Sequence, residues 1–521
     1  MNETTLSTVA EQCAARFSSR PCLVHGQRRW NFGEFWAQVE ALAAGLAARL
    51  PRGERVGLFM ANRAEYMLLQ FALERAGLVR VPLNMRFTRH EVAMILKDCG
   101  AAAVFHDEAT ADRIQTLASE FDHAWFCCVD ATSARHGPAW KDLLAHAGRV
   151  PQFTDPQALC SINYTSGTSG VPKGVMLTHR NWSALTRNML IDRDMRADDI
   201  VGHVGPLTHA SGTYFVPWFL RGACNVIVEG GTVDGLLETI GRERINAFTC
   251  VPTVLTRIVN HPRLEEFDLS SLRAIGYGAE PIPFNTLEKA LAKFGPILTQ
   301  NYGLTEAMMT VTTLPPEAHF IADTVTGQRV PRAGCIGRPY TFVEVVLRDE
   351  QGQPVPTGQI GEITIRSEHM TQGYWNRPEE TAKVLRDGWL WSGDLARCDE
   401  QGFITLAGRS KDMLISGGFN IYPAELEAVL TNHPQVVEAA VFGVPDPDWG
   451  EIAVAFIVPV PGSRPGDEEL LNHCKPLLGL RSPRRFALLD ALPKNANGKV
   501  DKPSLRGRAL ATFGSTEHAK R

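Results

Sequence analysis

The chain has 521 residues, of which 44% are hydrophobic and 21% charged, and its formal net charge is −4 at pH 7. This length predicts more than one domain, and the composition is typical of a globular protein. The balanced charge does not indicate a nucleic acid or an anionic membrane surface as a partner.

The 11 cysteines include no Cys-x-x-Cys pair, a pattern typical of reduced thiols in a cytoplasmic protein. The N-terminus, with Glu3 and Glu11, has no apolar core of a signal peptide. No uncharged apolar run approaches the length of a membrane span. We therefore expect a cytoplasmic protein without a membrane span.

The N-terminal part alternates between helical and strand patterns. Apolar residues recur at helical spacing over residues 39–50, and a helix is predicted over 64–76. Short apolar runs at 55–60, 79–83 and 101–105 predict buried strands. This alternation favours an α/β layer with parallel strands.

A segment rich in glycine and hydroxyl side chains follows the strand predicted at 159–164. Glycines at this spacing let backbone N–H groups turn towards an anion, and hydroxyls and a lysine add donors and charge. Pro172 and Gly174 flank the lysine, so the segment is not the common P-loop. The residues predicted to bind phosphate are Thr165, Ser166, Gly167, Thr168 and Lys173.

Further strands are predicted at 246–251 and 273–276, and the second of these runs into a glycine turn that contains Gly278. Pro281 stands where a dinucleotide fingerprint needs its last glycine, which excludes that fingerprint. A third polar motif spans residues 301–306. Its tyrosine can stack on a purine, its threonine can hold a phosphate oxygen, and Glu306 can meet a magnesium ion. A strand-end turn is the alternative.

Residues 335–410 are rich in strand and turn patterns. Asp394 follows Gly393 at a strand end, where a carboxylate suits the two hydroxyls of a ribose, although it could equally be a surface turn residue. A second domain is expected from Lys411, with Pro423 in the first turn of a helix. Its mixed helices and strands predict a small α+β domain.

Taken in order, these motifs resemble those of the adenylate-forming superfamily, which includes acyl-CoA synthetases, luciferases and peptide synthetase adenylation domains. The resemblance extends over the chain, from the hydroxyl-rich loop to the Pro-Lys-x-x-x-Gly-Lys ending at 493–499. It implies an α/β fold with a large N-terminal domain, residues 1–409, of two α/β layered subdomains plus a small β-barrel-like subdomain. A small α+β C-terminal domain, residues 411–521, is expected to follow.

The resemblance also implies roles for single residues. Lys499, Thr305, Glu306 and His209 are expected to be catalytic, with Glu306 as magnesium ligand, although an ordinary loop histidine is the alternative at His209. Tyr302 is expected to stack on adenine, and Asp394 and Arg409 to bind the ribose. The implied ATP- and AMP-binding set also contains Thr165, Ser166, Gly167, Thr168, Lys173, Gly278, Ala279, Glu280, Asn301 and Gly303.

The implied reaction is that of an ATP-dependent acid–CoA ligase, with ATP, Mg²⁺ and coenzyme A as cofactors. An acyl-adenylate forms first, and the small domain then pivots at Lys411 so that CoA can attack. Gly417 and Gly418 are expected to bind CoA, together with an exposed Trp449, for which a packed loop anchor is the alternative. A protein acetyltransferase acting on Lys499 and a second copy of the chain are further predicted partners.

Five residues are predicted to line the acyl pocket because they lie near the motifs. No arginine is expected to lie beside these positions to pair a second carboxylate, so a dicarboxylate such as malonate is disfavoured, and a medium-chain fatty acid or an aromatic acid is expected. The alternatives are transfer of the acyl group to a carrier protein and a nucleotide-binding module without catalysis. The predicted pocket residues are His209, Ser211, Tyr214, Tyr277 and Met308.

Overall fold

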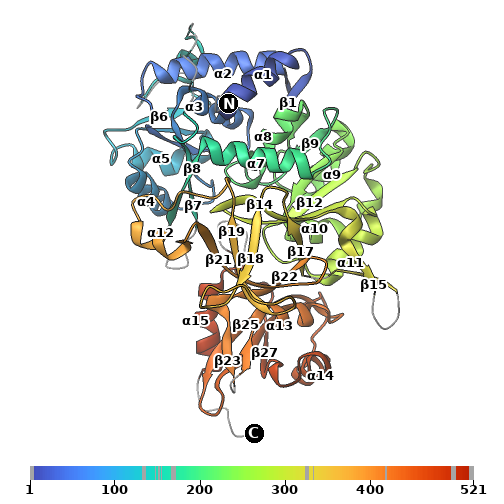
Figure 1. The fold of residues 1–521 in the computed structure, drawn as a ribbon. Helices are drawn as coiled ribbons and strands as arrows, with labels where there is room; N and C mark the ends of the chain where they lie inside the picture. Colours follow the sequence, from blue (N-terminus) through green and yellow to red (C-terminus); the bar gives the residue numbers. More distant parts are fainter. Residues whose placement is uncertain are drawn as a thin grey trace.

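The structure is a computed structural model, and its description covers most of the chain. The described residues are 5–131, 137–146, 148, 150, 153, 155–165, 172–322, 328–332, 334–416, 419–494 and 500–514. Two α/β lobes make up most of the N-terminal part, and a smaller C-terminal unit lies below them in Figure 1. The large N-terminal and small C-terminal parts expected from the sequence are both present.

The first lobe is built on a six-stranded sheet. In sheet order its strands are β6 (Trp125–Cys128), β5 (Ala103–His106), β3 (Arg55–Phe59), β4 (Val79–Pro82), β7 (Leu159–Thr165) and β8 (Lys173–Thr178). All neighbours are parallel except β7 and β8. Its helices are α2 (Phe32–Ala47), α3 (Ala64–Ala76), α4 (Arg89–Cys99), α5 (Ala111–Leu117) and α6 (Trp140–Leu144).

The predicted N-terminal elements are confirmed, although several boundaries shift by one to seven residues. Helix α3 has the predicted bounds, whereas α2 begins seven residues before the predicted start at residue 39. The reason is a capping box, in which Asn31 accepts from the backbone N–H of Glu34 and Glu34 accepts from that of Asn31. These two bonds satisfy backbone donors that would otherwise be unpaired.

The second lobe contains a parallel sheet that continues into antiparallel strands. In sheet order its strands are β2 (Arg28–Asn31), β1 (Pro21–His25), β10 (Cys224–Ile227), β9 (Ile200–His203), β11 (Ala247–Cys250), β12 (Ala274–Gly278), β13 (Leu298–Leu304) and β14 (Ala307–Leu314). The strands from β1 to β13 are parallel. The helices are α8 (Ala210–Arg221), α9 (Val233–Glu243), α10 (Pro252–Val259) and α11 (Phe284–Phe294).

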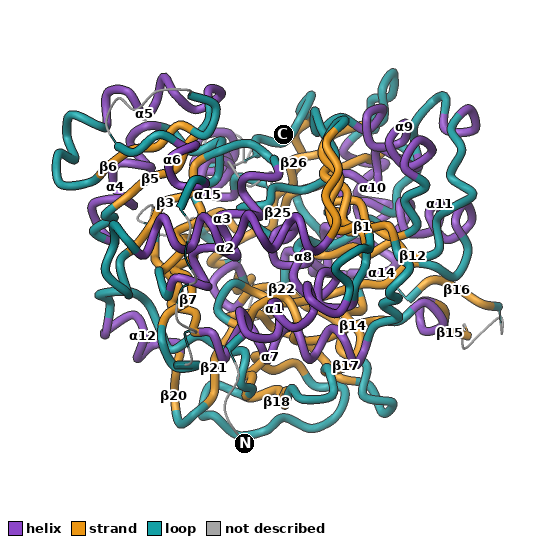
Figure 2. The backbone as a smooth tube through the Cα atoms, turned by 90° about the horizontal axis from the view of Figure 1, so that it is seen from above, coloured by secondary structure: helices purple, strands orange, loops and turns teal. Residues whose placement is uncertain are grey.

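One hydrophobic core joins the two lobes. It includes Phe35 and Phe71 from the first lobe and Phe215 and Phe219 from α8. Helix α7 (His179–Asp192) contributes Trp182, which is only 1% exposed. Figure 2 shows the lobes from above, with β3 and β5 in one and α9 to α11 in the other. The shared core holds β8 and α7 in place between them.

Antiparallel strands extend the second sheet towards the C-terminal unit. Strand β17 (Cys335–Pro339) pairs with β14 on one side and with β22 (Ile404–Arg409) on the other. The remaining strands of this layer are β18 (Glu344–Arg348), β19 (Ile360–Arg366), β20 (Leu385–Arg386) and β21 (Trp389–Cys398). The third layer is therefore continuous with the second lobe through β17.

The C-terminal unit is a five-stranded sheet with helices on both faces. Its elements are β23 (Leu414–Ser416), β24 (Phe419–Ile421), α13 (Pro423–Thr431), β25 (Val436–Asp446), β26 (Gly450–Pro459), α14 (Asp467–Leu478), β27 (Arg485–Leu488) and α15 (Lys502–Phe513). Alternate residues of β25 face different cores: Val441 packs with α13 and α14, and Phe442 packs with α15. The predicted bounds of α14 and the proline at the start of α13 are confirmed.

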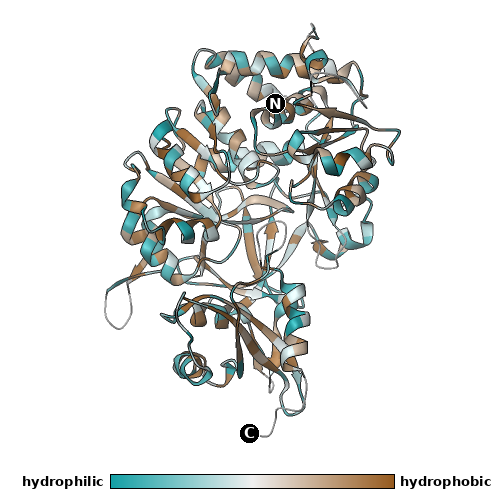
Figure 3. Cartoon of the chain, turned by 180° about the vertical axis from the view of Figure 1, so that it is seen from behind, coloured by the Kyte–Doolittle hydropathy of each residue, from teal (hydrophilic) through white to brown (hydrophobic). Residues whose placement is uncertain are grey.

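The other elements are short. They are α1 (Leu6–Arg16), α12 (Pro378–Val384), β15 (Phe320–Ala322), β16 (Arg329–Pro331) and 3₁₀ turns at Glu108–Thr110, Leu264–Glu266, Pro316–His319, Ser410–Asp412 and Gly479–Arg481. Figure 3 shows hydrophobic strands inside and hydrophilic outer faces on the surrounding helices. Within the described ranges, no helix combines the length and the apolar character needed to cross a membrane.

Glu74 is a buried carboxylate in the interior of α3. Its side chain is 0% exposed, and neither carboxylate oxygen has a hydrogen-bond partner among the described residues. Burial raises its pKa from 4.5 to about 7, and the charge of Arg80 offsets this only in part. The stability that Glu74 contributes is therefore complete below pH 4.5 and is lost as the pH rises to about 7.

We expect Glu74→Gln to remove this pH dependence, because glutamine cannot ionise. The wild type should lose about 1.4 kcal/mol per pH unit at this site within the window. Thermal unfolding of both proteins at several pH values measures the difference. Glu65→Gln is the control: burial there is outweighed by hydrogen bonds from Arg63 and Arg28, which lower the pKa of Glu65, so its effect should be constant across the window. Parallel curves for wild type and Glu74→Gln would contradict the prediction.

Candidate active site

The two ends of the hydroxyl-rich segment lie opposite each other. Thr165 ends β7 and Lys173 begins β8, and the two residues are partners in the antiparallel pairing. Thr165 Oγ1 donates to the carbonyl oxygen of Lys173 at 3.5 Å. The hairpin thereby fixes both ends of the segment predicted to bind phosphate. Ser166, Gly167 and Thr168, also predicted there, lie outside the described residues.

A tyrosine connects this segment to Glu306. Lys173 Nζ lies 5.3 Å from the centroid of the Tyr374 ring, within the range of a cation–π interaction. The Tyr374 hydroxyl donates to Glu306 Oε1 at 2.7 Å. Burial and the neighbouring Glu306 carboxylate raise the pKa of Tyr374. The sequence analysis missed Tyr374, because the residue reaches Glu306 across a separation of 68 residues and carries no local motif.

Thr305 and Glu306 form the turn between β13 and β14. The backbone N–H of Thr371 donates to the carbonyl oxygen of Glu306 at 2.7 Å, which holds this turn against the segment that carries Tyr374. No group of three or more His, Cys, Asp or Glu side chains within the described ranges could hold a metal ion. A single carboxylate nevertheless fits magnesium, which binds one or two carboxylates together with nucleotide phosphates.

A second cluster brings together three residues predicted to bind the nucleoside. The Tyr302 hydroxyl donates to Asp394 Oδ2 at 2.6 Å, and Arg409 Nε donates to Asp394 Oδ1 at 2.9 Å. Asp394 is 7% exposed, whereas Arg409 is exposed. Burial, followed by the Asp394 carboxylate, raises the pKa of Tyr302, and the same carboxylate raises that of Arg409. Strands β13, β21 and β22 thus meet at one carboxylate.

Two glycines allow the backbones of this region to approach closely. A Cβ at Gly278 would lie 2.1 Å from the carbonyl oxygen of Asn301, and one at Gly303 would lie 2.4 Å from the Cα of Met309. Asn301 Oδ1 accepts from the Tyr340 hydroxyl at 2.8 Å, which orients the buried amide. Any larger residue at Gly278 or Gly303 would force the strands apart.

The turn after β12 contains two further predicted residues. Ala279 is exposed and adopts a positive φ of 75°. Glu280 Oε1 accepts from the backbone N–H and the hydroxyl of Thr253, at 3.0 and 2.7 Å. The carboxylate of Glu280 therefore fixes the start of α10.

Ser211 and Tyr214 of α8 line a small cavity against β9 and β11. Its other lining residues include His203, Trp218 and Thr249, and its volume is about 10 Å³. His203 Nε2 lies 2.8 Å from Asn225 Oδ1, and burial lowers the pKa of His203 to about 4. The structure brings two of the predicted acyl-pocket residues together at this cavity.

The other three predicted acyl-pocket residues lie elsewhere. Tyr277 packs in the cluster of α11, on the opposite face of β12, and its hydroxyl lies 3.0 Å from His319 Nε2. Met308 belongs to the core shared by the two lobes, and its neighbour Met309 packs against both that core and the cluster that contains Tyr214. His209 is exposed at the start of α8.

The expectation that no arginine lies beside the pocket is wrong. The guanidinium carbon of Arg193 lies 5.6 Å from the centroid of the Tyr214 ring. Arg193 directly follows α7 as its C-cap residue, and α7 packs against α8. The sequence analysis missed this arginine because a full strand and a loop separate Arg193 from Tyr214 along the chain. A dicarboxylate therefore cannot be disfavoured on that ground.

The C-terminal unit shows a further correction. Trp449 is half-buried rather than exposed, packs against the cluster that contains Phe442 and Phe456, and lies 3.9 Å from the guanidinium carbon of Arg484. These contacts match the packed loop anchor. Lys411 is exposed in the 3₁₀ turn after β22. Gly417, Gly418 and Lys499 lie outside the described residues.

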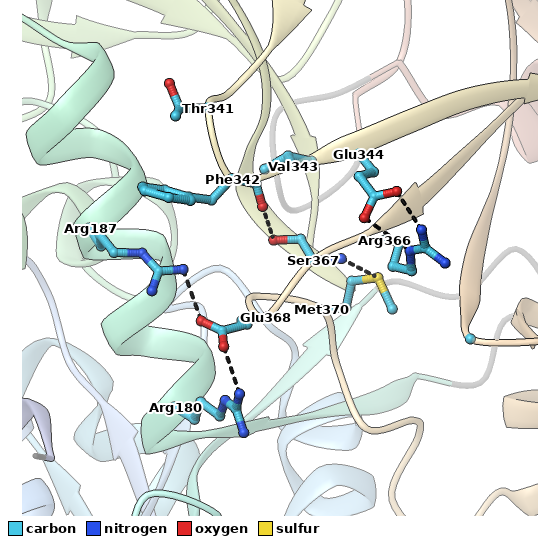
Figure 4. A pocket seen from close by; sticks show the side chains of 11 residues that line it. Arg180, Arg187, Thr341, Phe342, Val343, Glu344, Arg366, Ser367, Glu368 and Met370 are labelled. Carbon is cyan, nitrogen blue, oxygen red and sulfur yellow. Dashed lines mark hydrogen bonds and ion pairs between the residues drawn. The ribbon is translucent and has the colours of Figure 1, made fainter. Parts of the chain in front are cut away.

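A second, larger cavity lies away from these residues. It has a volume of about 720 Å³ and lies between α7 and strands β18 and β19. Figure 4 shows Glu368 between Arg180 and Arg187, and Glu344 paired with Arg366. The charges of this cavity are thus largely neutralised within the protein, and none of the described site residues discussed above lines it.

Comparisons with known proteins agree with this arrangement. The model of the AMP-binding enzyme family matches residues 10–375, and that of the AMP-binding enzyme C-terminal domain matches residues 425–499. The chain is 36% identical to a feruloyl-CoA synthase from Amycolatopsis sp, covering 95% of this chain and 97% of the relative. It is 32% identical to a medium/long-chain-fatty-acid–CoA ligase from Mycobacterium tuberculosis, covering 95% and 88% respectively.

A solved structure extends the similarity to the whole fold. The anthranilate CoA ligase AuaEII in complex with anthranoyl-AMP superposes with a TM-score of 0.89 at 25% identity, covering 98% of each chain. The chain therefore belongs to the AMP-binding family of adenylate-forming enzymes, as an AMP-forming ligase of the acyl-CoA synthetase type.

Proposed function

We propose that this ligase joins a carboxylic acid to coenzyme A at the expense of ATP. The observation that carries the proposal is the pair of clusters at Glu306 and Asp394, which both lie at the C-terminal end of β13 and its turn in a chain of the AMP-binding family. In the first step a carboxylate oxygen attacks the α-phosphorus and pyrophosphate leaves. In the second, the CoA thiol attacks the acyl carbon, AMP leaves and the thiol proton passes to solvent.

The charges of the first step explain the proposed roles. Negative charge builds on the phosphate oxygens as the acid attacks, and cations and fixed donors lower that barrier. Lys173 would hold the outer phosphates, and Thr305 and a magnesium ion on Glu306 the inner ones. Asp394 and Arg409 would bind the ribose, and Tyr302 the adenine. Magnesium supplies positive charge at the phosphates when it is bound.

We further propose that the acid is aromatic rather than a simple fatty acid. The observation that supports this is that two of the similar proteins are named for aromatic acids, a feruloyl-CoA synthase and an anthranilate CoA ligase.

The test is a panel of acids assayed for AMP, pyrophosphate and acyl-CoA formation. Hydroxycinnamic and anthranilic acids should give acyl-CoA with higher kcat/KM than octanoic acid. The CoA assignment would be overturned if the enzyme released AMP in the absence of CoA and needed a carrier protein or an amine as the acyl acceptor instead. Preference for octanoic acid would overturn only the aromatic assignment.

The second step requires the small domain to move, and we propose Lys411 as the pivot and the C-terminal unit as the moving part. Gly417 and Gly418 would then contact CoA. We also propose that a protein acetyltransferase modifies Lys499 and that the chain assembles with a second copy of itself. The 11 free cysteines suit the cytoplasmic location that we propose.

Lys499→Ala should nearly abolish adenylation and spare acyl transfer from a preformed adenylate. Lysine at this position of the motif would supply positive charge at the α-phosphate, so adenylation should fall about 100-fold or more. The two half-reactions are measured separately, by pyrophosphate release and by acyl-CoA formation from synthetic acyl-adenylate. Lys494→Ala is the matched control, since Lys494 pairs with Glu438 at 2.8 Å. Equal losses in both half-reactions would rule out the proposed role.

Tyr374→Phe should weaken the binding of magnesium–ATP. The hydroxyl of Tyr374 orients Glu306, and loss of such a partner lowers metal affinity about 10- to 100-fold. Titration of ATP at several magnesium concentrations by calorimetry measures the change. Tyr164→Phe removes a similar bond, to Asp98 Oδ2 at 2.6 Å, and should leave the magnesium dependence unchanged. The same magnesium dependence in both variants would argue against the link through Tyr374.

A further inference from the structure

Arg193 places its guanidinium group beside the ring of Tyr214, a residue that lines the small cavity against β9 and β11. The residue directly follows α7 in an extended conformation, with φ −121° and ψ 143°, and its side chain passes towards β12. A Cβ at Gly276 would lie 3.1 Å from Arg193 Nη2 and 2.5 Å from Thr249 Oγ1. The absence of a side chain at Gly276 therefore makes room for the arginine and threonine donors, and Thr249 itself lines the cavity.

The guanidinium also lies near two phenols. Burial raises the pKa of Tyr214 and of Tyr340, and the positive charge of Arg193 partly opposes the change in both. Tyr340 in turn donates to Asn301 of the nucleotide motif. A ligand group that entered the cavity beside Tyr214 would approach the guanidinium group of Arg193.

The charge of Arg193 has no carboxylate partner in the part of the chain that the structure describes. Its Nη1 is buried and makes no hydrogen bond there. Nearby acidic residues are engaged elsewhere: Asp192 accepts from the backbone and hydroxyl of Thr341, and Asp194 pairs with Arg196 and Arg273. A buried donor left unpaired is costly, and a ligand oxygen would remove that cost.

We propose that Arg193 is a specificity-determining residue that donates to an oxygen atom at the end of the acid remote from the reacting carboxylate. The inference rests on the proposed function and narrows its substrate to acids that carry a second oxygen group. The cavity of about 10 Å³ is close to the volume that one water occupies, so a substrate oxygen would take the place of a water. A phenol hydroxyl and a second carboxylate share this chemistry.

The experiment compares matched acids that differ only in the remote oxygen. One pair is 4-hydroxycinnamic and cinnamic acid, and the other is octanedioic and octanoic acid. The wild type should prefer the oxygen-bearing member of at least one pair by about 10- to 100-fold in kcat/KM, and the pair that shows the preference identifies the source of the oxygen. Arg193→Met should abolish that preference, and Arg193→Lys should restore part of it.

Arg187→Met is the matched control, because Arg187 lies on α7, which Arg193 directly follows, and pairs with Glu368 at 2.8 Å. The ratio of kcat/KM between the two acids of each pair should be the same for Arg187→Met as for the wild type. A wild type without preference in either pair would overturn the proposal without any variant, as would an Arg193→Met enzyme that keeps the wild-type ratio. A uniform loss for all acids in Arg193→Met would show a structural role. A wild type inactive with every acid would instead overturn the proposed function.

Discussion

The buried carboxylate of Asp394 is the contact on which the arrangement of the site depends. It accepts one hydrogen bond from Tyr302 and one from Arg409, and so joins β13, β21 and β22. A buried charge is tolerated only when it is paired and hydrogen-bonded, and here the two donors meet that need. Since Arg409 ends β22, the same contact fixes the point from which the chain passes into the C-terminal unit.

The second organising contact runs through Tyr374. The hairpin of β7 and β8 presents Lys173, the turn after β13 presents Glu306, and Tyr374 contacts both. Each of these residues comes from a different segment, so the site forms only after the two lobes have packed together. The shared core around Trp182 and Phe215 therefore supports the chemistry as well as the fold.

Much of this could be predicted from the sequence. Helices α3 and α14 have their predicted bounds, because their apolar spacing, and the following Gly77 and Gly479, define where they run. Tyr302, Asp394 and Arg409, to which the resemblance gave roles in binding the nucleoside, lie in one cluster. Local patterns and motif order carry this kind of information well.

The features that the sequence did not show depend on packing between distant segments and on which face of a sheet a side chain occupies. Strand β1 joins the second lobe through β10, a pairing across some two hundred residues that no local pattern encodes. Tyr277 and Gly276 lie on opposite faces of β12. Side chains alternate between the two faces of a strand, so this could have been concluded from the sequence, but the pocket prediction did not use it. Arg193 reaches Tyr214 only because α7 packs on α8.

The central claim is that the acid is activated by direct attack of its carboxylate on the α-phosphorus of ATP. The most direct test uses an acid labelled with oxygen-18 in both carboxylate oxygens, with ATP and CoA, and mass spectrometry of the products. Our account predicts that one labelled oxygen appears in AMP and none in pyrophosphate. Unlabelled AMP, or label in pyrophosphate or in inorganic phosphate, would contradict it.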